Sequence, residues 1–268
     1  MRILTSPLRV LPDFIVIGAQ KAGTTSLFNY LMEHPSIFPP FKKEIQFFDL
    51  NYKKGLLWYR SNFPTKIYKY LITKVSSRNF ITGEASPYYI LYPHAAKRVN
   101  SKLNKIKIII LLRNPINRSF SQYFHTIKSG SENLSFKEAI KKEDKRIEGE
   151  FEKILKDEDY RSSRFPAFAY LTRSIYINQI EKWFEYFPKN QILVIKSEDL
   201  FEKPKETLKL VFKFLNIPNW TKIKYKKYHS EAGGRKIDEE TRNYLKEYFK
   251  PYNLQLYEYL ERDFYWDQ

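Results

Sequence analysis

The stretch Gly18-Ala19-Gln20-Lys21-Ala22-Gly23-Thr24-Thr25-Ser26 decides how the N-terminal part of the chain is expected to fold. The apolar run Phe14-Ile15-Val16-Ile17 before it predicts a buried strand. After it, Leu27, Tyr30 and Leu31 have the spacing of one helix face. A strand, a glycine-containing loop and a helix in this order are typical of an anion site, because backbone N–H groups and the positive end of the helix dipole point into the loop.

The position of the lysine separates this loop from a nucleoside-triphosphate loop. That loop reads G-x-x-x-x-G-K-[ST], with the lysine directly after the second glycine. Here Gly18 and Gly23 keep the glycine spacing, but Thr24 follows the second glycine and the lysine is Lys21. We therefore expect a phosphate-type loop that does not bind ATP and Mg²⁺. An ordinary strand-to-helix turn with a solvated lysine stays open as the alternative.

Length and composition limit the classes of protein that remain. The 268 residues are 43% hydrophobic and include no cysteine, which suits one large α/β domain without disulfides or thiolate metal sites. The 4 histidines lack metal-ligand spacing, so we expect no bound metal. Residues 1–7 contain no long apolar region, so we expect no signal peptide, no membrane span and a cytoplasmic location.

The formal net charge of +17 predicts an anionic partner. Such a field attracts nucleic acid, an acidic lipid surface, a polyanionic glycan or a phosphorylated cofactor. Net charge does not choose among these, and a lysine-rich surface without a specific partner remains the alternative.

Residues 106–112, Ile-Lys-Ile-Ile-Ile-Leu-Leu, form the strongest predicted strand, buried on both faces of a parallel sheet. Arg113-Asn114-Pro115 follows, and proline suits the first position of a helix. Arg118, Ser121 and His125 then fall on one polar face of that helix. A P-loop NTPase needs a magnesium-binding Asp in such a region, whereas this chain has Arg113 directly after the strand, which favours a metal-free anion site.

The remaining chain extends this pattern. Residues 80–87 predict a further strand and turn with Glu84 at its end, and residues 191–195 predict another strand. A helical insertion at about 135–165 carries nearly balanced charges, so it is not a nucleic-acid arm. We expect a single domain, 1–268, with a parallel sheet of about four or five strands flanked by helices.

Two further segments carry candidate site residues. Glu44 lies between lysines and an apolar run, where a carboxylate is partly desolvated. Residues 233–236, Gly-Gly-Arg-Lys, are basic and glycine-bearing, and on their own they also suit an ordinary surface loop. Asp238 is expected to cap the following helix, and a separate final helix is expected to carry Leu256 and Leu260.

Four segments, in this order, resemble the sulfotransferases that use 3′-phosphoadenosine 5′-phosphosulfate (PAPS). The likeness runs from about Asp13 to the C-terminus and is strongest to the heparan-sulfate N-sulfotransferase and 3-O-sulfotransferase branch. The segments are Gln20–Ser26, then Lys43–Phe48 with Tyr52–Tyr59, then Arg113 with Ser121, and finally Gly234–Lys236.

The resemblance implies a P-loop-like α/β fold and metal-free transfer of a sulfuryl group from PAPS to a hydroxyl or amine of a glycan-like or other small acceptor. It implies that Lys21 stabilises charge on the bridging oxygen and that Glu44 is the general base. His125 either touches the sulfate or only packs. The implied cofactor-binding residues are Lys21, Ala22, Gly23, Thr24, Thr25, Ser26, Arg113, Ser121, Gly233, Gly234, Arg235 and Lys236.

The chain departs from this family pattern at four positions, and one of them is Asn114, where Asp is frequent after the arginine. Ala85 stands where the 3-O-enzymes have an active-site lysine, and Gln46 stands where they have a histidine. Gly233 stands where the covering loop usually begins with lysine, a charge that Lys236 can supply. The cofactor is therefore assigned more firmly than the acceptor.

Two other functions stay open from the residues. An ATP-dependent P-loop kinase predicts magnesium dependence and a lysine after Gly23. A non-catalytic polyanion-binding module predicts salt-sensitive binding that is indifferent to Glu44→Ala. As partners we expect a small-molecule or glycan acceptor and peripheral contact with an acidic surface, but no nucleic acid.

Overall fold

The computed structural model describes residues 2–226 and 234–267. The chain divides into two compact units: Met1–Leu112 with Phe184–Tyr228, and Arg113–Trp183 with His229–Gln268. The expectation of a single domain, 1–268, stays a prediction.

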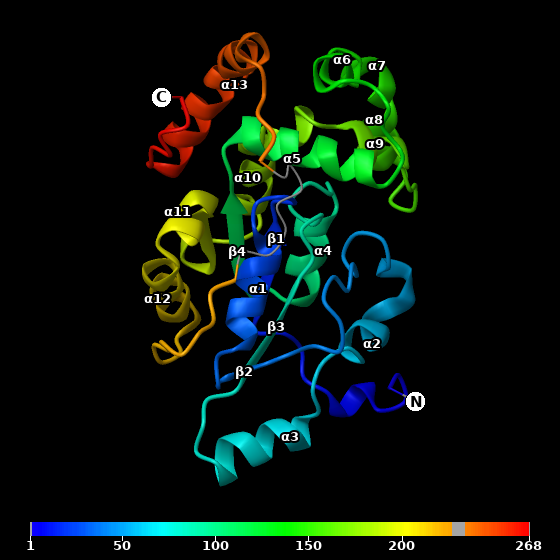
Figure 1. The fold of residues 1–268 in the computed structure, drawn as a ribbon. Helices are drawn as coiled ribbons and strands as arrows, with labels where there is room; N and C mark the ends of the chain where they lie inside the picture. Colours follow the sequence, from blue (N-terminus) through cyan, green and yellow to red (C-terminus); the bar gives the residue numbers. More distant parts are fainter. Residues whose placement is uncertain (1, 227–233, 268) are drawn as a thin grey trace. The chain divides into compact units, whose positions relative to one another are not determined.

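The first unit is built on a five-stranded sheet with the strand order β2-β3-β1-β4-β5. Strands β1 to β4 are labelled in Figure 1. Every strand pairing in it is parallel. The strands are β1 (Phe14–Gly18), β2 (Ile37–Phe38), β3 (Ile81–Ala85), β4 (Lys107–Leu112) and β5 (Ile192–Lys196). All of β1 and nearly all of β4 are buried, as their continuous apolar runs predicted. The predicted α/β class with a parallel sheet and flanking helices is confirmed.

Helices and short turns of helix connect these strands. The α-helices of this unit are α1 (Thr24–Met32), α2 (Gly55–Arg60), α3 (Lys66–Tyr70), α4 (Ala95–Lys102), α11 (Ser197–Glu202) and α12 (Pro204–Leu215). The shorter turns are η1 (Ser6–Leu8), η2 (Tyr52–Lys54), η3 (Leu71–Val75) and η5 (Lys189–Gln191). Helix α1 packs against β1, β2 and β3, whereas α11 and α12 pack against β5. Amphipathic helices bury their apolar stripes on the sheet in this way.

The strand order places the segments after β1 and β3 at one edge of the sheet. β3 and β4 pair on opposite sides of β1, with Val16 opposite both Ala85 and Ile109. The segments that follow β1 and β3 therefore leave the sheet side by side. Ligands of open α/β sheets bind outside the carboxyl ends of the strands, where the strand order reverses, so this edge is the first place to look for a site.

The second unit is helical in most of its described residues. Its helices are α5 (Pro115–Lys128), α6 (Phe136–Lys141), α7 (Glu143–Ile147), α8 (Glu150–Lys156), α9 (Arg164–Phe168), η4 (Thr172–Ser174), α10 (Tyr176–Phe184) and α13 (Glu239–Leu260). One apolar cluster joins Phe120 of α5 with Ile140 of α6 and Leu245 of α13. The predicted insertion at about 135–165 forms the short helices from α6 to α9, and its capping box is present at Ser135 and Glu138.

The C-terminal helix differs from the prediction. Asp238 caps it as expected, because its Oδ1 accepts from the Thr241 N–H at 2.8 Å. The prediction of two separate helices is wrong, because α13 continues through Pro251. Buried Leu245, Phe249 and Leu256 hold the helix along its length, and this packing outweighs the hydrogen bond that proline removes.

Candidate active site

The glycine loop follows β1, and its two glycines are needed for different reasons. Gly23 caps α1 with φ of 91°, which favours a residue without a side chain. A Cβ on Gly18 would lie 2.3 Å from Cγ2 of Ile90, so packing requires a glycine at this position. Lys21, between them, has a left-handed φ of 70°, which is uncommon for a residue with a side chain.

The first turn of α1 carries groups suited to an oxyanion. The first N–H groups of a helix have no acceptor within the helix. Thr24 and Ser26 are both buried in this turn. The Ser26 Oγ is buried without a hydrogen-bond partner, although buried hydroxyls are normally satisfied. These donors, with Lys21 three residues before Thr24, form a set suited to an oxyanion.

The predicted Ala22 takes part through its backbone. Its N–H donates to the Ala19 carbonyl at 3.1 Å, which closes the turn of the loop. Its carbonyl accepts from the buried Ser197 Oγ at 2.7 Å, which ties the loop to α11. Ala22 therefore shapes the loop.

Glu44 lies at the same edge of the sheet. Its N–H donates to the carbonyl of Ala85, the last residue of β3, at 3.1 Å. The side chain is 39% exposed, and its carboxylate accepts from Lys43 Nζ at 2.7 Å. Both Glu44 and Gln46 have left-handed φ angles, 59° and 52°. Such backbone strain persists only where the surrounding structure enforces it, and it is concentrated at functional sites.

A buried carboxyl group lies under the Glu44 loop. Glu84, on β3, is completely buried. One carboxylate oxygen accepts from the Tyr59 hydroxyl at 2.7 Å and the Tyr89 hydroxyl at 3.2 Å, and the other from Ser86 Oγ at 2.7 Å. Burial raises the pKa of Glu84 to about 7, although these hydroxyls act in the opposite direction.

Two of these hydroxyls also hold the Glu44 loop. Ser86 Oγ accepts from the Gln46 N–H at 3.1 Å. The Tyr89 hydroxyl accepts from the N–H groups of Phe47, at 2.7 Å, and Phe48, at 3.3 Å. Hydrogen bonds thus run from the loop backbone through two hydroxyls to Glu84. Glu84, which the sequence places at a strand end, therefore supports the loop.

Asp49 is a second buried carboxyl that the sequence did not single out. Its Oδ1 accepts from the Leu50 N–H at 2.6 Å, and its Oδ2 is buried without a partner. Burial raises the pKa of Asp49 to about 7. The Arg98 guanidinium donates to the carbonyls of Phe48, at 3.0 Å, and Asp49, at 3.2 Å. The one available signal was a carboxylate directly after two adjacent phenylalanines.

The second unit holds the residues predicted for the 3′-phosphate. Arg113 precedes α5, and its carbonyl accepts from the Tyr176 hydroxyl at 2.9 Å. Asn114 caps α5, because its side chain accepts from the N–H of Ile116 at 3.0 Å. Ser121 is buried in α5, whereas His125, one turn later, is exposed. The polar face that the spacing predicted is therefore only partly enclosed.

The predicted covering segment is partly described. Gly234 has φ of 82°, and Arg235 and Lys236 are exposed. The Arg235 guanidinium lies over the ring of Phe124, 4.9 Å from its centroid. This contact brings the segment to α5, beside the turn that carries Ser121. Gly233 lies outside the described residues.

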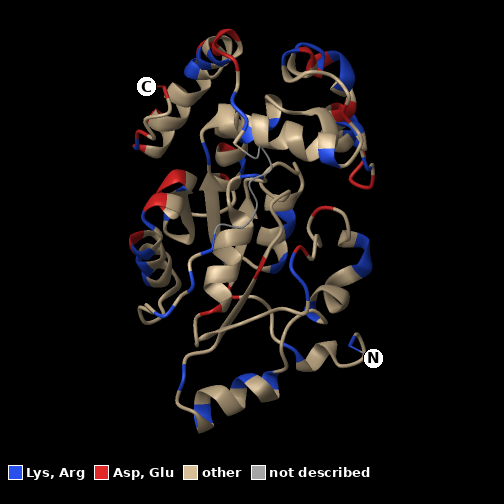
Figure 2. Ribbon diagram, viewed as in Figure 1, with Lys and Arg blue, Asp and Glu red and all other residues tan. Residues whose placement is uncertain are grey.

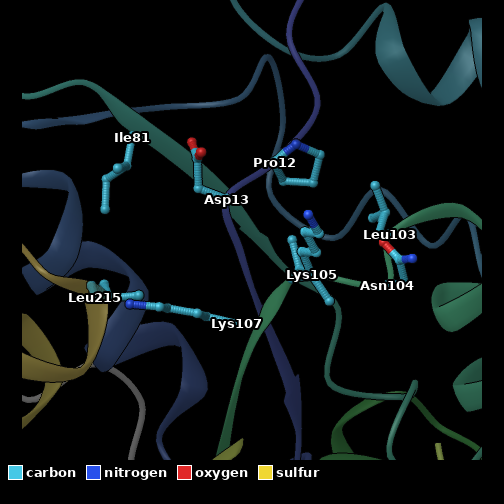
Figure 3. Close-up of a pocket in the computed structure, with 9 residues that line it drawn as sticks. Pro12, Asp13, Ile81, Leu103, Asn104, Lys105, Lys107 and Leu215 are labelled. Atoms are coloured by element: carbon cyan, nitrogen blue, oxygen red, sulfur yellow. The ribbon is translucent and has the colours of Figure 1, made fainter. Parts of the chain in front are cut away.

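The pocket in Figure 3 lies at the opposite edge of the sheet. It is a cavity of about 390 Å³ at the amino ends of the strands, where Asp13 precedes β1 and Lys107 begins β4. It contains none of the predicted site residues. Across residues 2–226 and 234–267, no group of three His, Asp or Glu side chains could hold a metal ion. In the same ranges, no helix is both long and apolar enough to cross a membrane.

Known proteins resemble this chain over nearly its whole length. The family described as Sulfotransferase domain matches residues 11–247. Membrane-associated sulfotransferase kil1 of Dictyostelium discoideum is 31% identical over 97% of this chain and 67% of that protein. Bifunctional heparan sulfate N-deacetylase/N-sulfotransferase 1 of Caenorhabditis elegans is 30% identical over 94% of this chain, which spans 30% of that protein. A solved sulfotransferase from Alicyclobacillus acidocaldarius aligns with a TM-score of 0.74 and 28% identity, over 97% of this chain and 100% of that one.

Proposed function

The chain belongs to the sulfotransferase domain family, as its motifs predicted, and from this premise we propose that it transfers a sulfuryl group from PAPS to a hydroxyl or amine. One observation carries the proposal. The partnerless Ser26 hydroxyl, at the helix N-terminus beside Lys21, shares one sheet edge with the strained Glu44 loop. Group transfer from an anionic donor requires an anion site and a positioned carboxylate, and the glycine loop and Glu44 are the candidates for these two roles.

Different residues of this chain would bind different parts of the donor. Lys21 to Ser26 would hold the 5′-phosphosulfate through backbone N–H groups, hydroxyls and the ammonium. For the second unit, the resemblance implies that Arg113 and Ser121 bind a 3′-phosphate and that residues 233–236 form the covering loop. When bound, PAPS supplies the sulfuryl group and leaves as 3′,5′-adenosine bisphosphate.

The chemical roles follow from the same positions. Glu44 accepts the proton that the acceptor hydroxyl or amine loses as its oxygen or nitrogen bonds to sulfur. Lys21 stabilises the negative charge that appears on the bridging oxygen. Glu84 takes no part in bond making, and it holds the backbone of the Glu44 loop. The role of His125 stays a prediction, since it is exposed on α5.

A glycan-like acceptor is the first class to screen, because a relative is named for heparan sulfate. The name of a second relative contains the term membrane-associated, which agrees with the predicted peripheral contact with an acidic surface. A cytoplasmic location stays part of the proposal.

The cofactor is tested by titration calorimetry of the full chain with 3′,5′-adenosine bisphosphate, in parallel with ATP and Mg²⁺. We expect metal-free binding of the bisphosphate that Arg113→Ala abolishes or weakens at least tenfold, because a charge-assisted contact to phosphate is lost. Arg164→Ala, an exposed arginine of α9, is the matched control and should bind as the wild type does.

Each other outcome points to a different function. Binding of ATP and Mg²⁺ alone would replace the sulfotransferase proposal with a kinase. Binding of neither nucleotide, with salt-sensitive retention of heparin, would indicate a non-catalytic polyanion-binding module.

A further inference from the structure

A long stretch of the first unit contains no acidic residue. Residues 50–83 include no Asp or Glu, and their basic residues are Lys53, Lys54, Arg60, Lys66, Lys69, Lys74 and Arg78. Within this stretch, α3 and η3 form one continuous helical segment, Lys66–Val75, here called the basic helix. Figure 2 shows basic residues along α3 and no acidic residue on it.

The basic helix exposes large apolar side chains. Ile67 is 66% exposed, Tyr70 is 60%, Leu71 is 47% and Val75 is 72%. Ile67, Leu71 and Val75 recur every four residues and Tyr70 lies three residues after Ile67, which places these side chains on neighbouring positions of one side of the helix. Single exposed apolar residues are ordinary on a protein surface, but a row of four on one short helix marks an interaction surface.

The opposite side of the basic helix is seated on the sheet. The ring of Tyr68 packs edge-to-face on Phe38 and Phe80, with ring centroids 5.5 and 6.1 Å away. Lys69 Nζ lies over the ring of Phe80, 5.5 Å from its centroid. The helix is therefore anchored on the edge strand β2 and the start of β3, and its apolar row faces outward.

The N-terminal segment lies beside the start of this helix. Arg9 forms an antiparallel bridge with Thr65, and the Val10 N–H donates to the Pro64 carbonyl at 3.0 Å. The same segment carries Leu4 and Leu8, both exposed. Further apolar and basic groups thus lie close to the basic helix.

We propose that the basic helix docks the protein on an anionic lipid surface. A helix with apolar and aromatic groups on one side and lysines along it lies in the headgroup region, with its aliphatic side chains in the acyl boundary and its lysines reaching the headgroups. A nucleic acid or glycan would engage the lysines but would not bury Ile67, Leu71 and Val75. The absence of acidic residues in 50–83 selects an anionic surface over a neutral one.

The proposal concerns a surface and stands whether or not the chain transfers sulfate. Its test is cosedimentation of the full chain with vesicles of phosphatidylcholine mixed with phosphatidylglycerol, and with vesicles of phosphatidylcholine alone. We expect binding to the mixed vesicles only. The triple variant Lys66→Gln, Lys74→Gln, Arg78→Gln should lower the partition coefficient on the order of a hundredfold, because each basic residue near an anionic surface contributes a factor of roughly five.

Helix α12 supplies the matched control. Lys205, Lys209 and Lys213 are exposed lysines on it, so their change to Gln removes the same charge elsewhere. We expect this variant to partition nearly as the wild type does. The triple variant Ile67→Ser, Leu71→Ser, Val75→Ser tests the apolar row at unchanged charge and should also lose most binding, whereas Leu210→Ser, exposed on α12, should not.

Each result of these vesicle-binding experiments either supports or overturns the proposal. Equal losses from the Lys66, Lys74 and Arg78 variant and from the α12 charge variant would show that the net charge acts diffusely and would overturn the proposal. Unchanged binding of the Ser variant would also overturn it, as would absence of binding to mixed vesicles. Unchanged thermal midpoints, and bisphosphate titration of every variant, establish that the variants are folded and keep the lipid result separate from the cofactor result.

Discussion

In the first unit, the carboxyl ends of the strands differ from the amino ends in backbone strain and in the burial of charged groups, a difference that cavity volume does not show. At the carboxyl ends of the strands, the non-glycine residues Lys21, Glu44 and Gln46 have left-handed backbones. Two carboxyl groups near them, Glu84 and Asp49, have pKa values raised to about 7 by burial. Strain and desolvated charge both cost stability, and proteins retain them together where chemistry requires them.

The amino ends of the strands carry the cavity of Figure 3 but little of this strain on charged groups. Burial raises the pKa of Asp13, yet its Oδ2 accepts from the Thr82 N–H at 2.8 Å, so it closes the start of β3. Lys107 donates to the carbonyl of Phe214 and joins β4 to the end of α12. These polar groups connect elements of the fold. We therefore place the candidate site by the charged residues with left-handed backbone, Lys21 and Glu44, and not by open volume.

Among the variants that test this comparison, Glu44→Gln should have the largest effect, and the effect is on the transfer rate. Loss of the general base should lower the transfer rate by about 10² to 10⁴, while bisphosphate affinity stays unchanged. The rate is measured with labelled PAPS and an acceptor obtained by screening. Glu206→Gln, an exposed glutamate of α12, is the control. An unchanged rate in Glu44→Gln would leave the strained loop with a purely structural role.

Tyr89→Phe tests the support beneath that loop. It removes the acceptor of the Phe47 and Phe48 N–H groups and one donor to Glu84. Leaving buried polar groups unsatisfied should lower the free energy of unfolding by about 1–3 kcal/mol. Urea unfolding measures this change. Tyr70→Phe, exposed on α3, should change the free energy of unfolding by less than about 0.5 kcal/mol. Equal effects of the two variants would contradict the network.

Glu84→Gln tests the charge of the network through pH. The pKa of Glu84 in the folded protein is about 7, which lies above its ordinary value. At pH values between these two, the folded state binds more protons than the unfolded state. Its contribution to stability is therefore present at low pH and is lost as the pH rises through about 7. We expect the free energy of unfolding to fall less steeply between about pH 5 and pH 8 in Glu84→Gln than in the wild type, by at most about 1.4 kcal/mol per pH unit.

The strands and the glycine loop could be predicted from the sequence, because local patterns encode them. A strand buried on both faces needs a continuous apolar run, so β1 and β4 were evident from residues 14–17 and 106–112. The glycine loop was evident from its spacing. The reason for Gly18 was not, because it depends on Ile90, which the fold brings to it from beyond β3.

The hydrogen-bond network beneath the Glu44 loop could not be predicted from the sequence for a similar reason. Glu84 meets Tyr59, which comes from a separate helix, and the hydroxyls of Ser86 and Tyr89 face a loop distant in sequence. No local pattern encodes such contacts. The strand β2 is only Ile37–Phe38, too short for any periodicity to show.

Lys107→Met should have the smallest effect and tests the other edge. Lys107 is only partly buried, and burial lowers its pKa. Losing its bond to the Phe214 carbonyl should cost about 1 kcal/mol of unfolding free energy. Because the amino ends of the strands carry no predicted site residue, bisphosphate affinity and transfer rate should stay at wild-type values. A large loss of bisphosphate affinity in a folded Lys107→Met variant would move the anion site to the cavity of Figure 3 and reverse the comparison.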